Sequence, residues 1–364
     1  MVRPMTTDSS LAAGYQAIWA GQPGKAEQPI LLALSLDPGS PERWADMAEA
    51  FHADGRDDDA RYCAAREVAR APGLPHVAMR AAGMYFRLNA PVTALQLTNR
   101  VVGETREYDG NVFQTWQRLG GTAADVFRWG VGSNTIAGRG YFRFLLDAGD
   151  RSATDAAWAA LGKKGMAGVT ESRFYAESLE RAHAYEVAAA IESGLSTEGV
   201  WNGGFESDWT GRGLDWLVES GTGVEVSRDT GVRHGGGASL RLEFDGTNRD
   251  EFSGISQVRV LPGGHWKLQA MVRTELKATA ADPHVAASGI GMRVRDEQTG
   301  RELAETASVS GAREWTPIAV SVDAGSHARP VRIEILRRAA APSELAMSGA
   351  AWVDDVTLTR EGSR

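Results

Sequence analysis

The chain has 364 residues, a length that suggests about two domains at roughly 100–200 residues each. Apolar residues make up 43% and charged residues 24%, which excludes a wholly disordered chain and a multi-span membrane protein. The net charge of −8 divides into −4 for residues 1–199 and −4 for residues 200–364. Neither part has the basic excess that binding to phosphates needs, so we expect no nucleic-acid partner.

Cys63 is the only cysteine, so the chain has neither an internal disulfide nor a zinc site built from several cysteines. The N-terminal residues lack the unbroken apolar stretch of ~7–15 residues that a secretory signal requires. No window approaches the ~18 apolar residues of a membrane span. The sequence therefore predicts a soluble chain without a visible signal peptide or membrane anchor.

Residues 1–195 show helical periodicity, because apolar side chains recur three and four positions apart. Within them a spacing of 34 residues repeats. The spacing predicts helix hairpins in which small residues lie at the close contacts, an aromatic residue packs beside them and a proline follows the second helix. The residues at equivalent positions are Ala26, Ala60 and Ala94; Gly14, Ala48 and Ala82; Ala17, Phe51 and Tyr85; and Pro38 and Pro72.

The middle copy resembles the tetratricopeptide repeat family. The resemblance covers about residues 7–106 and is carried by Trp44, Met47, Ala48, Phe51, Ala60 and Pro72. It implies an α-solenoid, which either only supports the next domain or offers a concave groove to a protein partner. Residues 138–163 and 170–193 also read as helix pairs, outside the 34-residue register.

From about residue 200, short runs alternate between apolar and polar residues and are separated by glycine-rich turns, which predicts an antiparallel β-sandwich. We therefore expect two domains, α then β: a helical repeat domain over 1–195, a linker over 196–201 and a sandwich over 202–364. The expected strands are SLRLEF, GISQVRVLP, HWKLQAMV, GIGMRVR, TPIAVSV, VRIEIL and WVDDVTL.

Four motifs occur in order along the sandwich: NGGFE at 202–206, HGGGASLRLEF at 234–244, QVRVLPGGHWKLQAMVRTE at 257–275 and WVDDVTL at 352–358. Together they resemble the jelly-roll carbohydrate-binding modules of families four and nine, which are similar to galactose-binding-like sandwiches. The resemblance implies the fold and, less directly, a glycan ligand, since a fold does not fix a function.

Strand alternation indicates which side chains could contact a glycan. Val258 and Val260 are expected to face the core, so Gln257 and Arg259 are expected to face outward, and the same reasoning applies to the other strands. The alternative is a solvated face on which arginines pair with acidic residues. Trp209 and Phe252 lie in apparent loops and could supply aromatic platforms for sugar rings, whereas Trp352 is expected to pack in the core or at an end. The outward candidates are Gln257, Gln269, Arg273 and Arg295, with Arg293 beside them.

Glu206 and Asp354 are candidate ligands of a structural calcium ion. Alternation places Asp354 on the side of Val356 and Leu358, and an inward carboxylate is costly unless it is paired. The resemblance implies that the first and last strands bring both carboxylates together around a calcium ion, whose preferred ligands are hard oxygens. In the alternative, backbone N–H groups alone hold Asp354.

No nucleophile, zinc or nucleotide-binding motif is present, so we expect a protein that is not an enzyme. Helical repeats followed by this kind of sandwich resemble bacterial envelope proteins encoded near exopolysaccharide or exosortase systems. The resemblance implies an adaptor in the envelope or periplasm that binds a protein partner and a polysaccharide. A cytoplasmic location is the alternative, since no signal peptide or membrane anchor is visible. The alternatives are a glycoside hydrolase or lyase with an appended binding module, and a structural protein with a degenerate sugar site.

Overall fold

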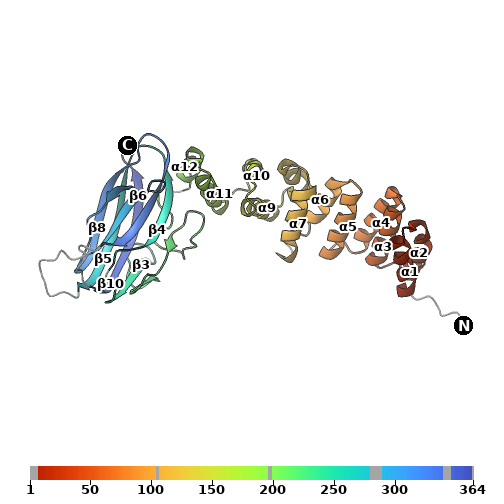
Figure 1. Cartoon of the computed structure of the whole chain (residues 1–364), viewed down its shortest axis with the longest axis horizontal. Helices are drawn as coiled ribbons and strands as arrows, with labels where there is room; N and C mark the ends of the chain where they lie inside the picture. Colours follow the sequence, from red (N-terminus) through yellow and green to blue (C-terminus); the bar gives the residue numbers. More distant parts are fainter. Residues whose placement is uncertain are drawn as a thin grey trace. The chain divides into compact units, whose positions relative to one another are not determined.

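A computed structural model describes residues 7–103, 106–195, 199–248, 250–278, 289–338 and 346–362 (Figure 1). Contacts between residues divide the chain into two compact units, Met1–Ala167 and Gly168–Arg364. Helices come first and strands follow, as the sequence predicts. None of the helices in the described ranges is both long and apolar enough to cross a membrane.

The first unit begins with three antiparallel helix hairpins, α1–α2, α3–α4 and α5–α6. Their helices are 9 to 14 residues long, and each second helix ends shortly before a turn. A short 3₁₀ helix, η1 (Pro23–Lys25), joins the first pair. The helices are α1 (Thr7–Trp19), α2 (Glu27–Leu36), α3 (Pro41–Ala53), α4 (Asp57–Arg70), α5 (Pro75–Arg87) and α6 (Pro91–Asn99).

The 34-residue spacing predicts the packing of these hairpins correctly. Ala26, Ala60 and Ala94 are all 0% exposed and lie at or near the start of each second helix. A Cβ atom on Gly14 would lie 2.5 Å from Ile30 Cγ1, so the first pair touches where a small residue was expected. The 34-residue repeat therefore reflects positions at which only a small residue fits between the two helices.

Beyond α6 the first unit continues without the repeat, around an aromatic cluster. Trp116 is 0% exposed, donates its indole N–H to Thr98 Oγ1 at 2.6 Å and meets the Tyr141 ring edge-on at 5.6 Å between ring centroids. The elements here are α7 (Arg106–Leu119), α8 (Ala123–Asp125), a π-helical segment η2 (Val126–Val131), α9 (Thr135–Asp147) and α10 (Arg151–Lys163).

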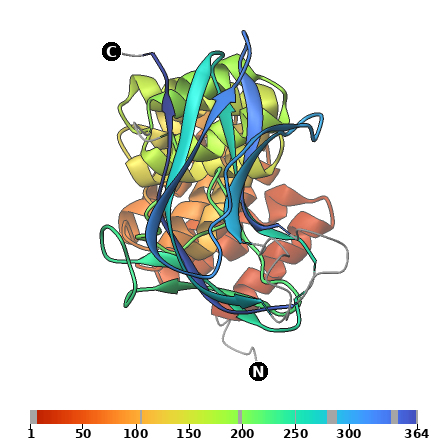
Figure 2. The ribbon, with the colours of Figure 1, turned by 90° about the vertical axis from the view of Figure 1, so that its left-hand side faces the viewer.

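The second unit contains α11 (Val169–Arg181), α12 (Tyr185–Ser193) and two five-stranded sheets whose described strand pairs are antiparallel. Sheet A has the order β1-β4-β9-β6-β7 and sheet B the order β2-β3-β10-β5-β8. Figure 2 shows the long strands side by side. The strands are β1 (Leu217–Val218), β2 (Val224–Asp229), β3 (Ser239–Asp245), β4 (Phe252–Leu261), β5 (His265–Ala278), β6 (Ile290–Asp296), β7 (Glu302–Glu305), β8 (Ala312–Asp323), β9 (Arg329–Arg337) and β10 (Met347–Arg360).

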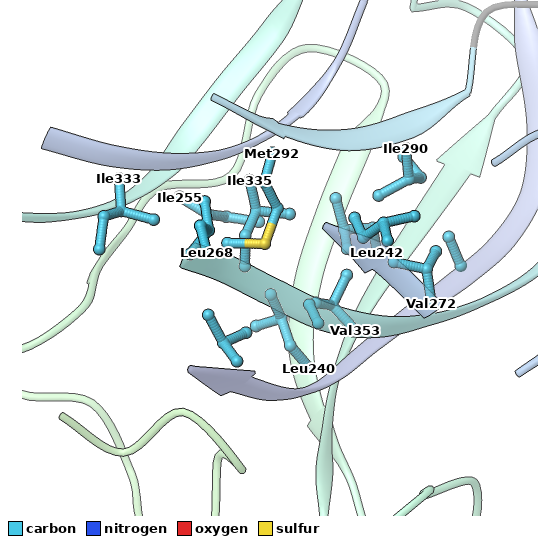
Figure 3. Packing of buried hydrophobic residues seen from close by; sticks show 14 of the residues in the cluster. Leu240, Leu242, Ile255, Leu268, Val272, Ile290, Met292, Ile333, Ile335 and Val353 are labelled. Carbon is cyan, nitrogen blue, oxygen red and sulfur yellow. The ribbon is translucent and has the colours of Figure 1, made fainter. Parts of the chain in front are cut away.

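Branched apolar side chains from both sheets fill the space between them (Figure 3). Ile255 and Ile333 come from sheet A, and Leu240, Val272 and Val353 from sheet B; all five are 0% exposed. Alternate residues of each strand supply this layer, which is why the period of two predicts a sandwich. The expected fold class, helical hairpins followed by an antiparallel β-sandwich, is confirmed.

The last helix pair belongs to the same unit as the sandwich, because α12 packs against β4 and β9 of sheet A. The loop before β1 also docks on α11: Gly213 donates its N–H to Glu177 at 2.8 Å, and a Cβ atom on this glycine would lie 2.8 Å from the Phe174 ring. The contacts thus divide the chain before α11, whereas the expected boundary at 196–201 marks the change from helices to strands. Residues 196–198 lie outside the described residues.

Candidate functional site

Strand β4 has the opposite orientation to the one expected from its valines. Gln257 lies opposite Ile333 and Arg259 lies opposite Val331, and cross-strand partners share a face. Since Ile333 and Val331 are core residues, Gln257 and Arg259 face the interior, while Val258 lies opposite Arg332 on the outer face. The expectation was wrong because α12 covers this strand from outside, so the strand is buried on both faces and alternation does not identify the core side.

Gln257 is a structural residue. It is 1% exposed and forms two hydrogen bonds with the backbone of Trp201, one accepted from the N–H and one donated to the carbonyl, both 2.9 Å long. Its side-chain amide thereby pairs with the segment before the sandwich in the way a neighbouring strand would. This geometry leaves no contact of Gln257 free for a glycan.

The sandwich does not bring the six expected glycan-binding residues together. Gln257 and Arg295 lie in sheet A, whereas Gln269 and Arg273 lie in sheet B, on the other side of the core. The remaining two residues, Trp209 and Phe252, are not exposed loop platforms: Trp209 is partly buried against the core, and Phe252 lies in β4, 6% exposed within the core.

The outer face of sheet A carries paired charges. Arg293 Nε lies 2.7 Å from Glu334 Oε2, and both side chains are 7% exposed. Arg293 also contacts Glu251 at 2.7 Å, and Arg295 Nη1 lies 3.9 Å from Glu334 Oε1. Each buried charge therefore has a partner, as burial requires. This face matches the alternative in which the arginines pair with acidic residues.

Trp352 lies at the centre of the outer face of sheet B, a position that sequence reasoning missed. It is opposite Arg241 on β3 and Arg273 on β5, and their guanidinium carbons lie 5.9 and 5.6 Å from its ring centroid. Its indole N–H donates to Asp229 at 2.8 Å, and the two arginines leave it only 5% exposed. Gln269 is exposed on the same sheet. One residue in the sequence indicates this position of Trp352. Val353 is apolar and occupies the core, and neighbouring residues of a strand point to opposite faces, so Trp352 points outward.

Asp354 also lies on a different side from the one expected. Val353 and Val356 both point into the core, because β10 bulges between Asp354 and Thr357, with Asp355 at a φ of 49°. Asp354 is nevertheless 0% exposed, since the 234–237 loop covers it. Burial raises the pKa of Asp354, while hydrogen bonds from backbone N–H groups oppose that rise.

The same loop also binds Glu206. Asp354 Oδ2 accepts the N–H groups of His234 at 2.8 Å and Gly235 at 3.0 Å, and the carboxylate of Glu206 accepts that of Gly237 at 2.9 Å. A Cβ atom on Gly204 would lie 3.6 Å from Glu206 Oε1 and 3.8 Å from Asp354 Oδ1, so both carboxylates lie near Gly204. In the described ranges neither carboxylate pairs with a basic side chain, and no group of three or more acidic, histidine or cysteine side chains has the geometry of a metal site.

In the first unit, the first hairpin carries several exposed apolar side chains, and others are spread over later elements, for example Tyr62, Leu119 and Ile136. Trp19 is 80% exposed, and Leu31, Leu32 and Leu36 of α2 are 43%, 37% and 54% exposed. Leu32 and Leu36 are four residues apart, so they lie on one face of the helix. Several large apolar side chains on one helix pair are typical of an interaction surface.

No family model matches the chain, and no curated protein matches it. Solved structures that are similar to parts of it include the xylan-binding CBM22-1 domain of Xyn10C from Paenibacillus barcinonensis, at 16% identity over 43% of this chain and 90% of that one, with a TM-score of 0.27. The type III secretion translocator chaperone SycD of Yersinia enterocolitica is 14% identical over 31% of this chain and 87% of its own, with a TM-score of 0.27. Pseudomonas aeruginosa pilF is 16% identical over 52% and 90%, with a TM-score of 0.28. At these values the similarities carry no conclusion about what this chain binds.

Proposed function

We propose that the chain is a non-enzymatic adaptor, which binds a protein partner through its helical hairpins and a glycan through its sandwich. We place this role in the assembly or export of bacterial envelope polysaccharide, on the motif resemblance of the two halves. The observation that carries the proposal is the apolar surface of the first hairpin, which consists of Trp19, Leu31, Leu32 and Leu36.

We infer a protein partner because leaving these apolar side chains exposed to water is unfavourable in free energy. Fully burying one leucine is worth about 1.5–3 kcal/mol. Leu32 and Leu36, at 37% and 54% exposed, together expose about as much as one whole leucine, so an interface over both would gain an energy of this order. Site-specific photo-crosslinking in the native cells tests this surface. A crosslinker at Leu36 should give one discrete adduct, and a crosslinker at Ala65, which is exposed on α4, should give none. Equal labelling from both positions would refute the assignment.

We assign the proposed glycan-binding site to the outer face of sheet B. Helix α12 packs on β4 and β9 of sheet A, and buried ion pairs occupy the outer face of that sheet, whereas Arg273, Gln269 and Trp352 share the outer face of sheet B. Planar guanidinium groups and amides donate hydrogen bonds to sugar hydroxyls, and an indole ring supports the apolar face of a sugar. Binding would require one arginine to move off Trp352.

Electrophoresis of the full chain through gels that contain soluble polysaccharides tests this face. Arg273→Ala should weaken the retardation about tenfold, the lower end of what a hydrogen bond from a charged group contributes. Arg295→Ala is the matched control, because this arginine is also partly exposed and near a glutamate but lies on sheet A. Equal effects of both variants would contradict the assignment to sheet B. Failure of every polysaccharide to retard the parent chain would instead favour the structural alternative, which the paired charges of sheet A already fit.

We also propose that Glu206 and Asp354 hold a structural calcium ion. Glu206 and Asp354 would supply two carboxylates near Gly204, neither of which has a basic partner among the described side chains, and the further oxygen ligands would have to come from backbone carbonyls and water. Calcium prefers such oxygen ligands. A bound ion would neutralise both carboxylates and tie the start of the sandwich to its last strand. The competing arrangement is the one in which loop 234–237 satisfies them through N–H groups alone.

Chelation distinguishes the two arrangements. An ion that binds only the folded state at a hundredfold excess over its Kd stabilises it by about 2.7 kcal/mol. Chelator should therefore lower the Tm of the full chain, and Asp354→Ala should abolish that sensitivity. A chelator-insensitive parent with no metal by elemental analysis would show that the backbone N–H groups hold both carboxylates.

A further inference from the structure

One end of the sandwich contains a hollow of about 280 Å³ that the proposed function does not use. Its floor is apolar and includes Leu261 of β4 and Leu358 of β10, both members of the core. The end of α12, with Ser193, forms another part of the lining. The hollow therefore opens between the two sheets and is bordered by the last helix of the chain.

Arg259 and its partner Glu192 are the buried charged groups among the side chains that line this hollow. Arg259 faces the interior opposite Val331, is only 5% exposed and places Nε 2.9 Å from Glu192 Oε2. Among the described residues, Nε of Arg259 is a buried donor without a well-aligned hydrogen bond, despite this short ion pair. A guanidinium group can bind two acceptors at once through its planar set of donors, so Arg259 retains donors for a ligand.

An aromatic ring and a second guanidinium group lie beside it. Trp266 and Arg360 are cross-strand partners on β5 and β10, so both side chains lie on one face of sheet B, and both line the hollow. Their remaining bonds are local: Trp266 donates its N–H to the carbonyl of Pro262 at 3.1 Å, and Arg360 donates to that of Gly263 at 3.0 Å. These bonds orient the ring and the guanidinium group without consuming all the donors of Arg360.

The charges of the hollow select a monoanion. When Glu192 is ionised, Arg259 and Arg360 contribute two positive charges and Glu192 one negative charge, which leaves a net charge of +1. The carboxylate of Glu192 already accepts the N–H of Val260 at 3.1 Å, in addition to its contact with Arg259. An acidic ligand must therefore bind on the side of Arg360, away from Glu192, where attraction to both arginines exceeds repulsion from one carboxylate.

We propose that this hollow binds a sugar acid, with the carboxylate between Arg259 and Arg360 and the apolar face of the ring against Trp266. Arginine and carboxylate form paired charge-assisted hydrogen bonds, and an indole ring packs against a sugar ring. The volume lies just below the ~300–1,000 Å³ of pockets for drug-sized ligands, which suits a single uronic acid unit. The proposal rests on the proposed function only in taking a sugar as ligand, and its residues are separate from those of the outer face of sheet B.

Calorimetric titration of the full chain with D-glucuronate, D-galacturonate, D-glucose and inorganic phosphate tests the proposal. We expect a uronate to bind and glucose not to bind. Arg360→Gln should weaken uronate binding about tenfold or more, since it removes a charge-assisted hydrogen bond at an exposed position. At pH 8, where Glu192 is ionised, Glu192→Gln should strengthen it, because the substitution removes the negative charge and keeps the shape. The matched control is Arg313→Gln, an exposed arginine at the opposite end of β5 and β8, which should change nothing.

The proposal would be overturned by no binding of either uronate, by binding of glucose as tight as that of the uronates, or by uronate binding that neither Arg360→Gln nor Glu192→Gln alters. Phosphate binding as tight as uronate binding would reduce the site to a general anion site and also overturn it. Arg273→Ala separates the two glycan assignments. It should leave uronate binding intact even if it abolishes retention by polysaccharide gels.

Discussion

Raising the pH should weaken the sandwich unit through one buried side chain, Glu192. Burial raises the pKa of Glu192 from 4.5 to about 7, and the neighbouring Arg259 and the N–H of Val260 only partly oppose this rise. The folded state thus holds the proton more tightly than the unfolded chain does. Stability is therefore greatest when Glu192 is protonated and falls as the pH rises from about 4.5 to about 7. At ~1.4 kcal/mol for each unit of pKa, the loss is about 3 kcal/mol.

Other charged groups around Glu192 also affect how the stability changes with pH between about 4.5 and 7. Arg259 faces it from β4, and Arg360 lines the same hollow from β10. From α11, the negative charge of Glu180 adds to the rise in the pKa of Glu192. The pKa of Glu180 is itself raised by burial, so part of its own titration can fall in the same range. A comparison with a variant at position 192 isolates the contribution of Glu192 to the change in unfolding free energy with pH.

Urea unfolding of the full chain, followed by tryptophan fluorescence between pH 4.5 and 8, measures this term. The difference in unfolding free energy between the parent and Glu192→Gln should change by about 3 kcal/mol over that range, with the parent losing stability. Glu186→Gln, on the exposed side of the same helix, should show no such change. A constant difference for Glu192→Gln, or a parent that gains stability with pH, would show that the attraction of Arg259 outweighs the burial of the carboxylate.

Three further substitutions test the packing. Ala60→Leu should destabilise the first unit by about 1–3 kcal/mol, because residue 60 is 0% exposed at a helix contact, while Ala65→Leu on the exposed side of α4 should leave its Tm unchanged. Phe252→Ala should cost about 3–5 kcal/mol by urea unfolding, as expected for a core residue and not for a loop platform. Arg293→Met should cost about 3–5 kcal/mol in the same assay, because it leaves Glu334 buried without its partner; a loss below 1 kcal/mol would mean that Glu334 keeps its hydration.

Local patterns in the sequence were sufficient for the fold class. The 34-residue repeat is a direct record of close helix contacts, and Ala26, Ala60 and Ala94 are buried where it predicts. The strand period of two likewise identifies seven of the strands, but it misses β1, β2 and β7, of which β2 contributes Val224 to the core. Helices α11 and α12 also follow from periodicity, but periodicity does not say which unit they pack on. That choice depends on distant contacts such as the one between Glu192 and Arg259.

The candidate site was harder to predict, because alternation assigns faces only where one face of a strand meets water. Strand β4 has the core on one side and α12 on the other, so its valines did not mark the interior. Strand β10 changes face at the bulge near Asp355, which moved Asp354 and Trp352 to the outer side. Both errors arise from tertiary contacts that a single strand does not encode.

Helix α12 also stabilises the sandwich on which it packs. A fragment that begins at residue 200 would lose the partner of Arg259, which is 5% exposed and buried beside the core, and would uncover Val260, which is 2% exposed. An unpaired buried guanidinium group costs several kcal/mol, so such a fragment is expected to be less stable than the same residues in the full chain. Glu192 lies on the last helix and also lines the hollow at the end of the sandwich. The helix thus contributes to the stability of the sandwich and to the charge of its hollow, and a ligand that binds there would respond to both.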